Sequence, residues 1–500
     1  MTIQGLHLSI IDQTIIRSYI KVLLIYPFPD PYKFGDASTA LGSGLRSTLQ
    51  QYPYLAGSVG PADPVTGKVT AQYPDRIPNV LDSGVFQTVC EPASYSDFDY
   101  ANLKEQGMPP EVLTSDRFCP ISLKDHPGTG CSAADSVQEL RNGPVPALAV
   151  QVTLISGGLV LSVYAHHCLM DGAGLGVFLE RYATNVQTCR PDFQDKSSTP
   201  HDHSARRRDI DALVSASKRS LSSSHCPEFQ LSPISSKEAI PPAANLRAHP
   251  HVMTSRILTF SHGRLSNLRD AMVNALNKRV SVFTVLTALL WVNVARSREP
   301  ALIEAGVQDQ ETALGIAVNL KRALGEGFED YVGNVSFAAW TSIPISKLTA
   351  MKSQLKMSPD SSTAKQTDCS MLEAVRTISA TLSELDRDWM LKRISYLSAV
   401  PDPRRLGYAF STVNSPHFFV NDWQALGADT HWDIPGTTSS QPEFIRRPYS
   451  EGEGGAFGII LPRRRSNGAQ SNYEVLVRLA EEDMARFENE MERWVERVLA

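Results

Sequence analysis

The stretch 149–174, AVQVTLISGGLVLSVYAHHCLMDGAG, decides which fold this sequence can adopt. An apolar run is followed by Gly157-Gly158 and then by a second run, LVLSVYAHH, which together predict a β-hairpin. After the DGAG turn, apolar residues recur at helical spacing, at Leu175, Phe178, Leu179, Tyr182 and Val186. The stretch therefore predicts two paired strands and a helix, with a histidine pair where strand gives way to turn.

Sequence on either side of this stretch predicts a mixed α/β protein. Upstream, we expect a buried strand at 18–27 and a helix at 37–51 whose stripe is Leu41, Leu45 and Leu49. Downstream, further strands are expected at 255–259, 313–320, 334–341 and 474–480, with helices at 265–276 and 281–296. A last helix is expected to bury Met484, Phe487, Met491, Trp494 and Val498.

The chain length and one change of composition indicate two domains. A chain of 500 residues is more than a single hydrophobic core usually supports. Between about 188 and 250, Ser, Pro, Arg, His and Asp dominate, as in STPHDHSARRRD, which is typical of a connection. We therefore expect domains at 1–187 and 251–500, joined by an exposed, poorly ordered polar linker at 188–250, with some strands exchanged between them.

Charge and cysteine usage exclude several classes of protein. The net charge of −5 does not favour a nucleic-acid-binding surface. The N-terminus lacks a signal-peptide pattern, and its longest apolar run, Val22 to Tyr26, is too short to span a bilayer. Seven scattered cysteines without a CxxC pair suggest neither a zinc ribbon nor a disulfide framework. We expect a monomeric cytoplasmic protein that binds neither membrane nor nucleic acid.

The motif His166-His167-Cys168-Leu169-Met170-Asp171-Gly172 admits three interpretations. A metal site is disfavoured because no other ligand cluster lies nearby in sequence and adjacent strand residues face opposite ways. A dinucleotide loop is disfavoured because the glycines following Asp171 are spaced GxGxG and not GxGxxG. The third interpretation is a general base at a strand end.

Strand alternation decides which histidine would be the base. His167 shares a face with Ala165 and Val163, whereas His166 shares the other face with Tyr164. One imidazole is thus offered to a cleft, and its pKa near neutrality suits proton transfer. Asp171 is expected to fix the local backbone, and Cys168 to be a buried structural thiol. The sequence carries no GxSxG elbow and no GxxxxGK[ST] loop as a rival.

The order of motifs resembles the BAHD acyltransferases, including fungal members such as trichothecene 3-O-acetyltransferase. HHCLMDG resembles the family's HxxxD motif. Further similarities run along nearly the whole chain: LSIIDQ (8–13), YPYLAGSV (52–59), SVFTVLTALLW (281–291), AVNLKRAL (317–324), YVGNV (331–335) and MARFENEM (484–491). Each is weak alone, and their order is what makes the resemblance specific.

The resemblance implies a fold and a reaction. The fold would be two similar chloramphenicol-acetyltransferase-like α/β domains, each a mixed sheet flanked by helices, with a channel between them. Acyl-CoA would enter this channel as a co-substrate from one end and the acceptor from the other. His167 would take the proton from the acceptor as it attacks the thioester, so neither a metal nor a covalent acyl-enzyme is needed.

Two departures from the family pattern concern the supporting residues. The family's DFGWG signature is replaced by Trp432-Asp433-Ile434-Pro435-Gly436, which retains only Asp433. Lys321 stands where the family usually has an arginine that pairs with the motif's aspartate. By this resemblance, the residues expected to support the site are Asp171, Gly172, Lys321 and Asp433. The expected CoA contacts are Ser281, Thr284, Arg446 and Arg447, with helix capping and surface charge as alternative roles.

The expected function is transfer of an acyl group, most simply acetyl, from CoA to a hydroxyl or amine of a small-molecule secondary metabolite. Two alternatives stay open. One is a condensation or cyclisation catalyst that takes its acyl group from a carrier protein, as the double-histidine form permits. The other is a binding-only relative, which the retained His167 does not favour.

Overall fold

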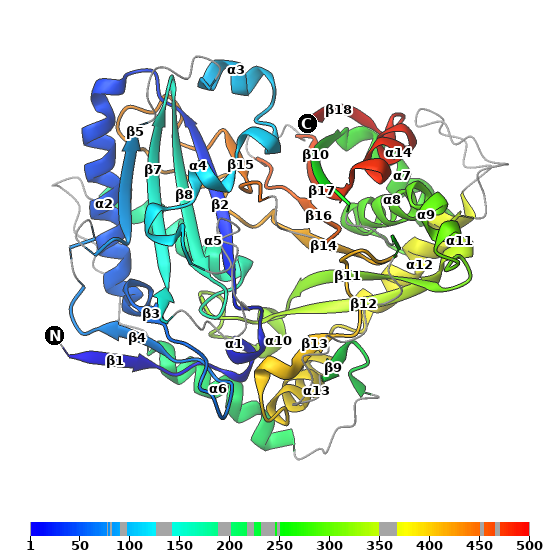
Figure 1. Cartoon of the computed structure of the whole chain (residues 1–500), viewed down its shortest axis with the longest axis horizontal. Helices are drawn as coiled ribbons and strands as arrows, with labels where there is room; N and C mark the ends of the chain where they lie inside the picture. Colours follow the sequence, from blue (N-terminus) through cyan, green and yellow to red (C-terminus); the bar gives the residue numbers. More distant parts are fainter. Residues whose placement is uncertain are drawn as a thin grey trace.

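The computed structural model describes residues 2–77, 79–80, 83–90, 98–126, 143–188, 202–217, 225–231, 246–247, 251–349, 368–450, 455–465 and 471–499. Its two lobes lie side by side, each built on one large sheet (Figure 1). No helix in these ranges is both long and apolar enough to cross a bilayer. Most of the expected linker lies outside them.

The first lobe contains a five-stranded sheet. In spatial order its strands are β15 (Phe444–Arg446), β2 (Tyr19–Pro27), β8 (Gly158–His166), β7 (Leu148–Ile155) and β5 (Phe86–Cys90). The expected hairpin is present, because β7 and β8 pair antiparallel from Leu148–Ala165 to Ile155–Gly158. Nearly every residue of β2, β7 and β8 is buried, which explains why these strands read as continuous apolar runs rather than alternating ones.

Helices α2 (Phe34–Gln51) and α5 (Gly172–Thr188) pack against each other in this lobe. The predicted leucine stripe of α2 is fully buried, and Tyr182 of α5 donates to the Leu41 carbonyl at 3.0 Å. The remaining strands are β1 (Ile3–Leu6), β4 (Ala71–Pro74), β3 (Ser58–Val59) and β6 (Val145–Pro146), which form a four-stranded sheet. The short helices are α1 (Ile10–Thr14), α3 (Tyr100–Glu105) and α4 (Ser115–Phe118).

The second lobe contains a seven-stranded mixed sheet. In spatial order its strands are β12 (Ser336–Pro344), β11 (Glu311–Asn319), β14 (Phe418–Asp422), β16 (Phe457–Ile460), β17 (Tyr473–Ala480), β10 (Met253–Phe260) and β18 (Val495–Leu499). Helix α8 (Val282–Ser297) is apolar all round and buried from Thr284 to Ser297, as expected for a central helix. Around it pack α7 (His262–Leu276), α11 (Ile345–Thr349), α12 (Cys369–Ser383) and α14 (Glu481–Met491).

The remaining elements lie around the second lobe and between the lobes. They are α6 (His203–Ser217), α9 (Glu299–Glu304), α10 (Lys321–Leu324), α13 (Arg387–Ser398), and the ribbon of β9 (Phe229–Leu231) with β13 (Leu406–Tyr408). Helix α6 lies within the expected linker, yet Arg207 and Ile210 on it are fully buried. The expectation of an exposed connection is therefore wrong for this segment.

The end of the chain also differs from expectation. Helix α14 stops at Met491, and the chain then turns into β18, so Trp494 and Val498 are not helical. The apolar spacing continues past Met491, but β10 has an edge there, and β18 pairs with it from Ile257–Leu499 to Phe260–Val495. Backbone hydrogen bonds to an open sheet edge outweigh local helical periodicity.

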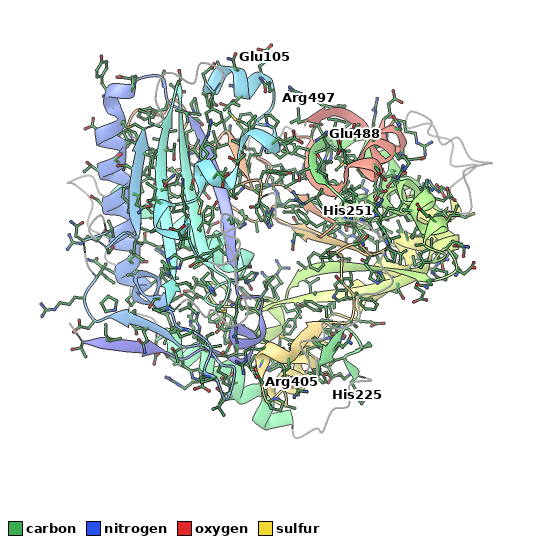
Figure 2. The ribbon with its side chains drawn as sticks, viewed as in Figure 1. Glu105, His225, His251, Arg405, Glu488 and Arg497 are labelled. Carbon is green, nitrogen blue, oxygen red and sulfur yellow. The ribbon has the colours of Figure 1, made fainter. Side chains whose placement is uncertain are left out.

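Two features tie the lobes together. Strand β15 comes from late in the sequence but pairs antiparallel with β2 in the first lobe, and Trp432, Ile434 and Ile445 belong to that lobe's core. Polar contacts also cross between the lobes. Figure 2 shows Arg497 of β18 near Glu105 of α3, where the arginine donates to the Glu105 carbonyl.

Candidate active site

His167 lies one residue beyond the end of β8, at the point where the chain leaves the first lobe's sheet. Its backbone N–H donates to the Ser18 carbonyl at 2.8 Å, which extends the β2–β8 pairing by one bond. The side chain is half-buried, whereas its two neighbours, His166 and Cys168, are both 0% exposed. The strand end therefore offers one histidine of the pair to solvent and keeps the other inside.

His166 and Cys168 belong to the scaffold, as the alternation argument predicted. The His166 ring packs edge-on against Tyr19 at 5.1 Å, and its Nδ1 accepts the Cys168 N–H at 3.4 Å. Burial lowers the pKa of His166 to about 3 and raises the pKa of the Cys168 thiol to about 12. At neutral pH both side chains are uncharged, and the thiol is a poor nucleophile.

Asn334 fixes the protonation pattern of His167. The Asn334 side chain is fully buried, and its Nδ2 donates two hydrogen bonds of 2.8 Å, to the His167 carbonyl and to Oδ1 of Asp12. Both partners only accept, so the amide oxygen must point to His167 Nδ1, at 3.2 Å. A carbonyl oxygen cannot donate, so Nδ1 carries the proton and Nε2 has a free lone pair.

The surroundings keep this imidazole neutral. Burial lowers the pKa of His167 below its usual 6.5. Hydrogen bonding to the backbone carbonyl of His167 itself, the Asp171 charge, and hydrogen bonds to Asn334 and to the Met170 carbonyl oppose that shift only in part. A neutral imidazole with a free Nε2 is the form that can accept a proton. The geometry thus provides a proton acceptor at a half-exposed position in an otherwise buried loop.

Asp171 ties this loop to both lobes. The carboxylate is fully buried and accepts three hydrogen bonds of 2.8 Å, from the Gly174 N–H, the Val335 N–H and the Ser336 hydroxyl. The first holds the start of α5, and the other two hold the start of β12. Asp171 therefore joins the loop that follows His167 to the second sheet.

Asp171 and Lys321 do not form the expected ion pair, since among the described residues no contact of 4.0 Å or less joins them. Burial lowers the pKa of Lys321, and the charges of Asp171 and Asp330 offset this only partly. The carboxylate needs no cation, because neutral donors already satisfy both of its oxygens.

Glycines let α5 approach the second lobe closely. A Cβ on Gly174 would lie 2.0 Å from the Val332 carbonyl oxygen, and one on Gly176 would lie 2.8 Å from the Ala425 carbonyl oxygen. A Cβ on Gly172 would meet nothing within 4 Å. The packing therefore requires Gly174 and, less severely, Gly176, and the expected support by Gly172 is limited to starting the helix.

The loop that replaces DFGWG packs as a structural element. Trp432 is fully buried with its ring 5.0 Å edge-on from Tyr182 of α5. Asp433 is exposed and has a left-handed backbone, with φ of 49°, a conformation that aspartate tolerates better than most residues. The loop thus anchors the second lobe to α5 through Trp432, and Asp433 serves the turn.

The four residues expected to contact CoA have different surroundings in the structure. Ser281 caps α8 by accepting the Thr284 N–H at 3.0 Å, which is the alternative role foreseen for both residues. Arg446 is buried, and its guanidinium donates to Glu474 at 2.9 Å and to the Gly107 and Met108 carbonyls. Its donors are engaged inside the protein, so the expectation that Arg446 meets CoA phosphates is wrong. Arg447 is half-buried, with its guanidinium 5.2 Å from the Phe457 ring.

Three residues around the base were not recognised from the sequence: Asn334, Asp12 and Arg207. Asn334 and Asp12 lie in YVGNV and LSIIDQ, two quoted motifs, but a single sequence gives no reason to bring them together. Their signal is chemical, because a polar residue between apolar neighbours must find a partner if it is buried. Among the described residues, no group of three or more His, Cys, Asp and Glu side chains could hold a metal ion.

Comparison with known proteins places this geometry in a family. The Transferase family model matches residues 133–494, and the model of the trichothecene 3-O-acetyltransferase-like N-terminal domain matches residues 18–184. Trichothecene 3-O-acetyltransferase of Fusarium sporotrichioides is 24% identical over 98% of this chain and 95% of its own length. Eremophilane O-acetyltransferase of Penicillium rubens is 23% identical over 92% of each.

Solved structures agree on the fold. The crystal structure of the Fusarium sporotrichioides enzyme complexed with coenzyme A and T-2 superposes with a TM-score of 0.72 at 19% identity, covering 99% of this chain and 100% of that one. Vinorine synthase superposes with a TM-score of 0.56 at 17% identity, covering 98% and 94%. The matched family model includes the strand that presents His167 and every strand of the second sheet except β18, so this chain belongs to the Transferase family of acyltransferases with the BAHD fold.

Proposed function

We propose that this protein is a CoA-dependent acyltransferase that moves an acyl group, most simply acetyl, to a hydroxyl or amine of a small-molecule secondary metabolite. The observation that carries the proposal is the free Nε2 of His167, fixed by Asn334 at 3.2 Å from Nδ1 and left half-exposed. The names of the relatives, which are acetyltransferases of trichothecenes and eremophilanes, support the acetyl group and the class of acceptor.

The reaction balances with His167 as the only titrating group. Nε2 accepts the proton of the acceptor's O–H as the oxygen attacks the thioester carbonyl, giving a tetrahedral intermediate and an imidazolium. When the intermediate collapses, the C–S bond breaks, and the imidazolium returns its proton to the leaving sulfur. Acylated product and free CoA leave, and the histidine is neutral again. The other proton stays on Nδ1 throughout, hydrogen-bonded to the Asn334 oxygen.

The supporting residues keep this centre in place. Asp171 ties the loop that follows His167 to the start of α5 and to the start of β12. Trp432 packs the loop at 432–436 against α5. We propose Ser281, Thr284 and Arg447 as residues near the bound CoA, without Arg446. We also propose that the enzyme works as a monomer with a channel between its lobes. We propose a cytoplasmic location as well, which the free thiols of its described cysteines support.

The test is to incubate purified protein with acetyl-CoA and a panel of hydroxylated sesquiterpenoids, and to detect acetylated products by mass spectrometry. Product formation that disappears in His167→Ala supports the proposal. Free CoA can be followed in parallel, with an enzyme-only blank because Cys90 and Cys369 are exposed thiols. Light scattering and cell fractionation test the monomer and its compartment. Acyl transfer only from a carrier-protein thioester would favour the condensation alternative, and ligand binding without turnover would favour a binding-only protein.

A further inference from the structure

A buried ionic network lies directly behind Asn334. Asp12 of α1 is 0% exposed and accepts five hydrogen bonds. Its Oδ1 accepts from the backbone N–H of Asn334 at 3.2 Å and from Nδ2 of Asn334 at 2.8 Å. Its Oδ2 accepts from the N–H and hydroxyl of Ser9, both at 2.9 Å, and from Nε of Arg207 at 3.0 Å. Every direction around the carboxylate is therefore occupied by a donor.

Arg207 closes the network from a different part of the chain. It lies on α6, is 0% exposed, and packs its guanidinium 5.0 Å from the Tyr54 ring and 5.6 Å from the Tyr331 ring. Besides Asp12, it donates through Nη2 to the Leu169 carbonyl at 2.9 Å, inside the HHCLMDG loop. A single side chain thus holds both the partner of Asn334 and the loop that carries His167.

We propose that Asp12 is a positioning residue for the catalytic base, acting through Asn334, and that Arg207 makes α6 part of the active-site support. The inference rests on the proposed role of His167 and adds how its tautomer is selected. If the Asn334 amide flipped, its oxygen would face the Asp12 carboxylate and the His167 carbonyl, and its NH2 would donate to His167 Nδ1. The imidazole proton would then move to Nε2, and the ring could no longer accept a proton there.

The carboxylate of Asp12 forbids this flip, because two oxygens would meet without a hydrogen between them. Substitution by asparagine weakens the preference for the native orientation. In Asp12→Asn, Arg207 and Ser9 require the new side-chain oxygen on their side, so its NH2 must face the NH2 of Asn334. These two donors repel each other, so only the His167 carbonyl still opposes the flip. The variant therefore shifts the tautomer balance towards the Nε2-protonated form with almost no change in side-chain volume.

The first experiment does not depend on turnover. The protein is labelled with 15N-histidine, and the ring signals of His167 are assigned with a His167→Gln sample. We expect Nδ1 to be protonated and Nε2 unprotonated in the wild type, and an increased share of the Nε2-protonated form in Asp12→Asn. An unchanged tautomer in a folded Asp12→Asn protein would overturn the inference even if the protein proves to be an acetyltransferase.

The second experiment is a double-mutant cycle in the acetyl-transfer assay. Asp12→Asn should lower kcat about 10- to 100-fold, less than the loss of the base itself, and should leave KM for acetyl-CoA unchanged. In an Asn334→Ala background, Asp12→Asn should have little further effect on kcat, because the Asn334 amide through which Asp12 acts is missing. A full additional loss would mean that Asp12 acts through stability alone. Absence of activity in the wild type contradicts the proposed function and leaves the tautomer measurement valid.

Asp368 supplies a matched control. Asp368 is the N-cap of α12, much as Asp12 belongs to the capping box at the start of α1, and it pairs with a buried arginine, Arg296, at 2.8 Å. Asp368→Asn should lower the melting temperature without changing the His167 tautomer or kcat. If Asp12→Asn does not fold, the double variant Asp12→Leu/Arg207→Met replaces the ion pair with apolar side chains, an exchange that buried pairs often tolerate. It should fold with reduced kcat, and wild-type kcat in this variant would refute the inference.

Discussion

Replacing Gly174 by alanine tests the link between helix packing and catalysis. The new Cβ would lie 2.0 Å from the Val332 oxygen and 2.8 Å from its carbonyl carbon, so the YVGN segment must retreat by about 1.4 Å to reach ordinary contact. Overpacking of this kind costs about 1–3 kcal/mol. Asn334 follows Val332 by two positions, so a shift of this size would break its 3.2 Å contact with His167. A displacement of about 1 Å at a reacting group can cost about 10²-fold in rate.

Gly172→Ala is the control, two residues earlier in the same helix. Its Cβ would meet nothing within 4 Å, and alanine is favoured over glycine in helices by up to about 1 kcal/mol. Thermal unfolding and steady-state acetyl transfer should show that Gly174→Ala is less stable and slower, and that Gly172→Ala is at least as stable as the wild type and has the same kcat. Wild-type kcat in Gly174→Ala would refute the reasoning, because the YVGN segment could then move without disturbing the base.

Four further outcomes are expected. His167→Ala should lower kcat by about 10²–10⁴ without weakening acetyl-CoA binding in calorimetry, and weaker binding would place the ring in the CoA site. Arg446→Gln should lose about 1–3 kcal/mol of stability, because glutamine cannot replace the hydrogen bonds of the buried guanidinium to Glu474 and to the Gly107 and Met108 carbonyls, while its Kd for CoA stays unchanged; a large rise in Kd would return Arg446 to the CoA site. Asp171→Asn should lose about 1–3 kcal/mol and much of its activity, because the NH2 faces donors, whereas Lys321→Met should keep its activity; equal losses would indicate an ion pair after all. The pKa of His166 is lowered to about 3 in the folded protein. Below pH 6.5 the unfolded state therefore binds a proton at this histidine that the folded state does not bind, and the free energy of unfolding decreases as the pH is lowered. In urea titrations at pH 5, His166→Phe should therefore lose about 2 kcal/mol less than the wild type relative to pH 8, and parallel curves would contradict the assignment.

Elements whose apolar pattern is strong were predictable from the sequence. The β7–β8 hairpin, the leucine stripe of α2 and the central helix α8 all follow from local periodicity. In each of them the apolar residues that form the sequence pattern are the residues that the fold buries. The burial of His166 and the exposure of His167 were predictable for the same reason, since strand alternation assigns the two histidines to opposite faces.

The sequence alone could not predict structure that depends on contacts with residues far away in the chain. Residues after Met491 carry a helical pattern and nevertheless form β18, because β10 offers an unpaired edge. Arg207 looks like part of a solvated basic triplet until Asp12 is known to lie opposite it. The pairing foreseen for Asp171 was wrong because the start of β12 supplies neutral donors at that place. In each case a local pattern is outweighed by a partner more than 100 positions away.

His167, the proposed catalytic base, is held by the same contacts that hold the two lobes together. The backbone of His167 is tied to β2 by Ser18, and its ring is tied to the second lobe by Asn334. The loop that follows it is bound to α6 by Arg207 and to β12 by Asp171. No lobe alone could present the imidazole with its proton on Nδ1, because the groups that select that tautomer come from both. Rotation of one lobe relative to the other would therefore change the base itself as well as the space around it, so activity should be lost before the individual sheets unfold.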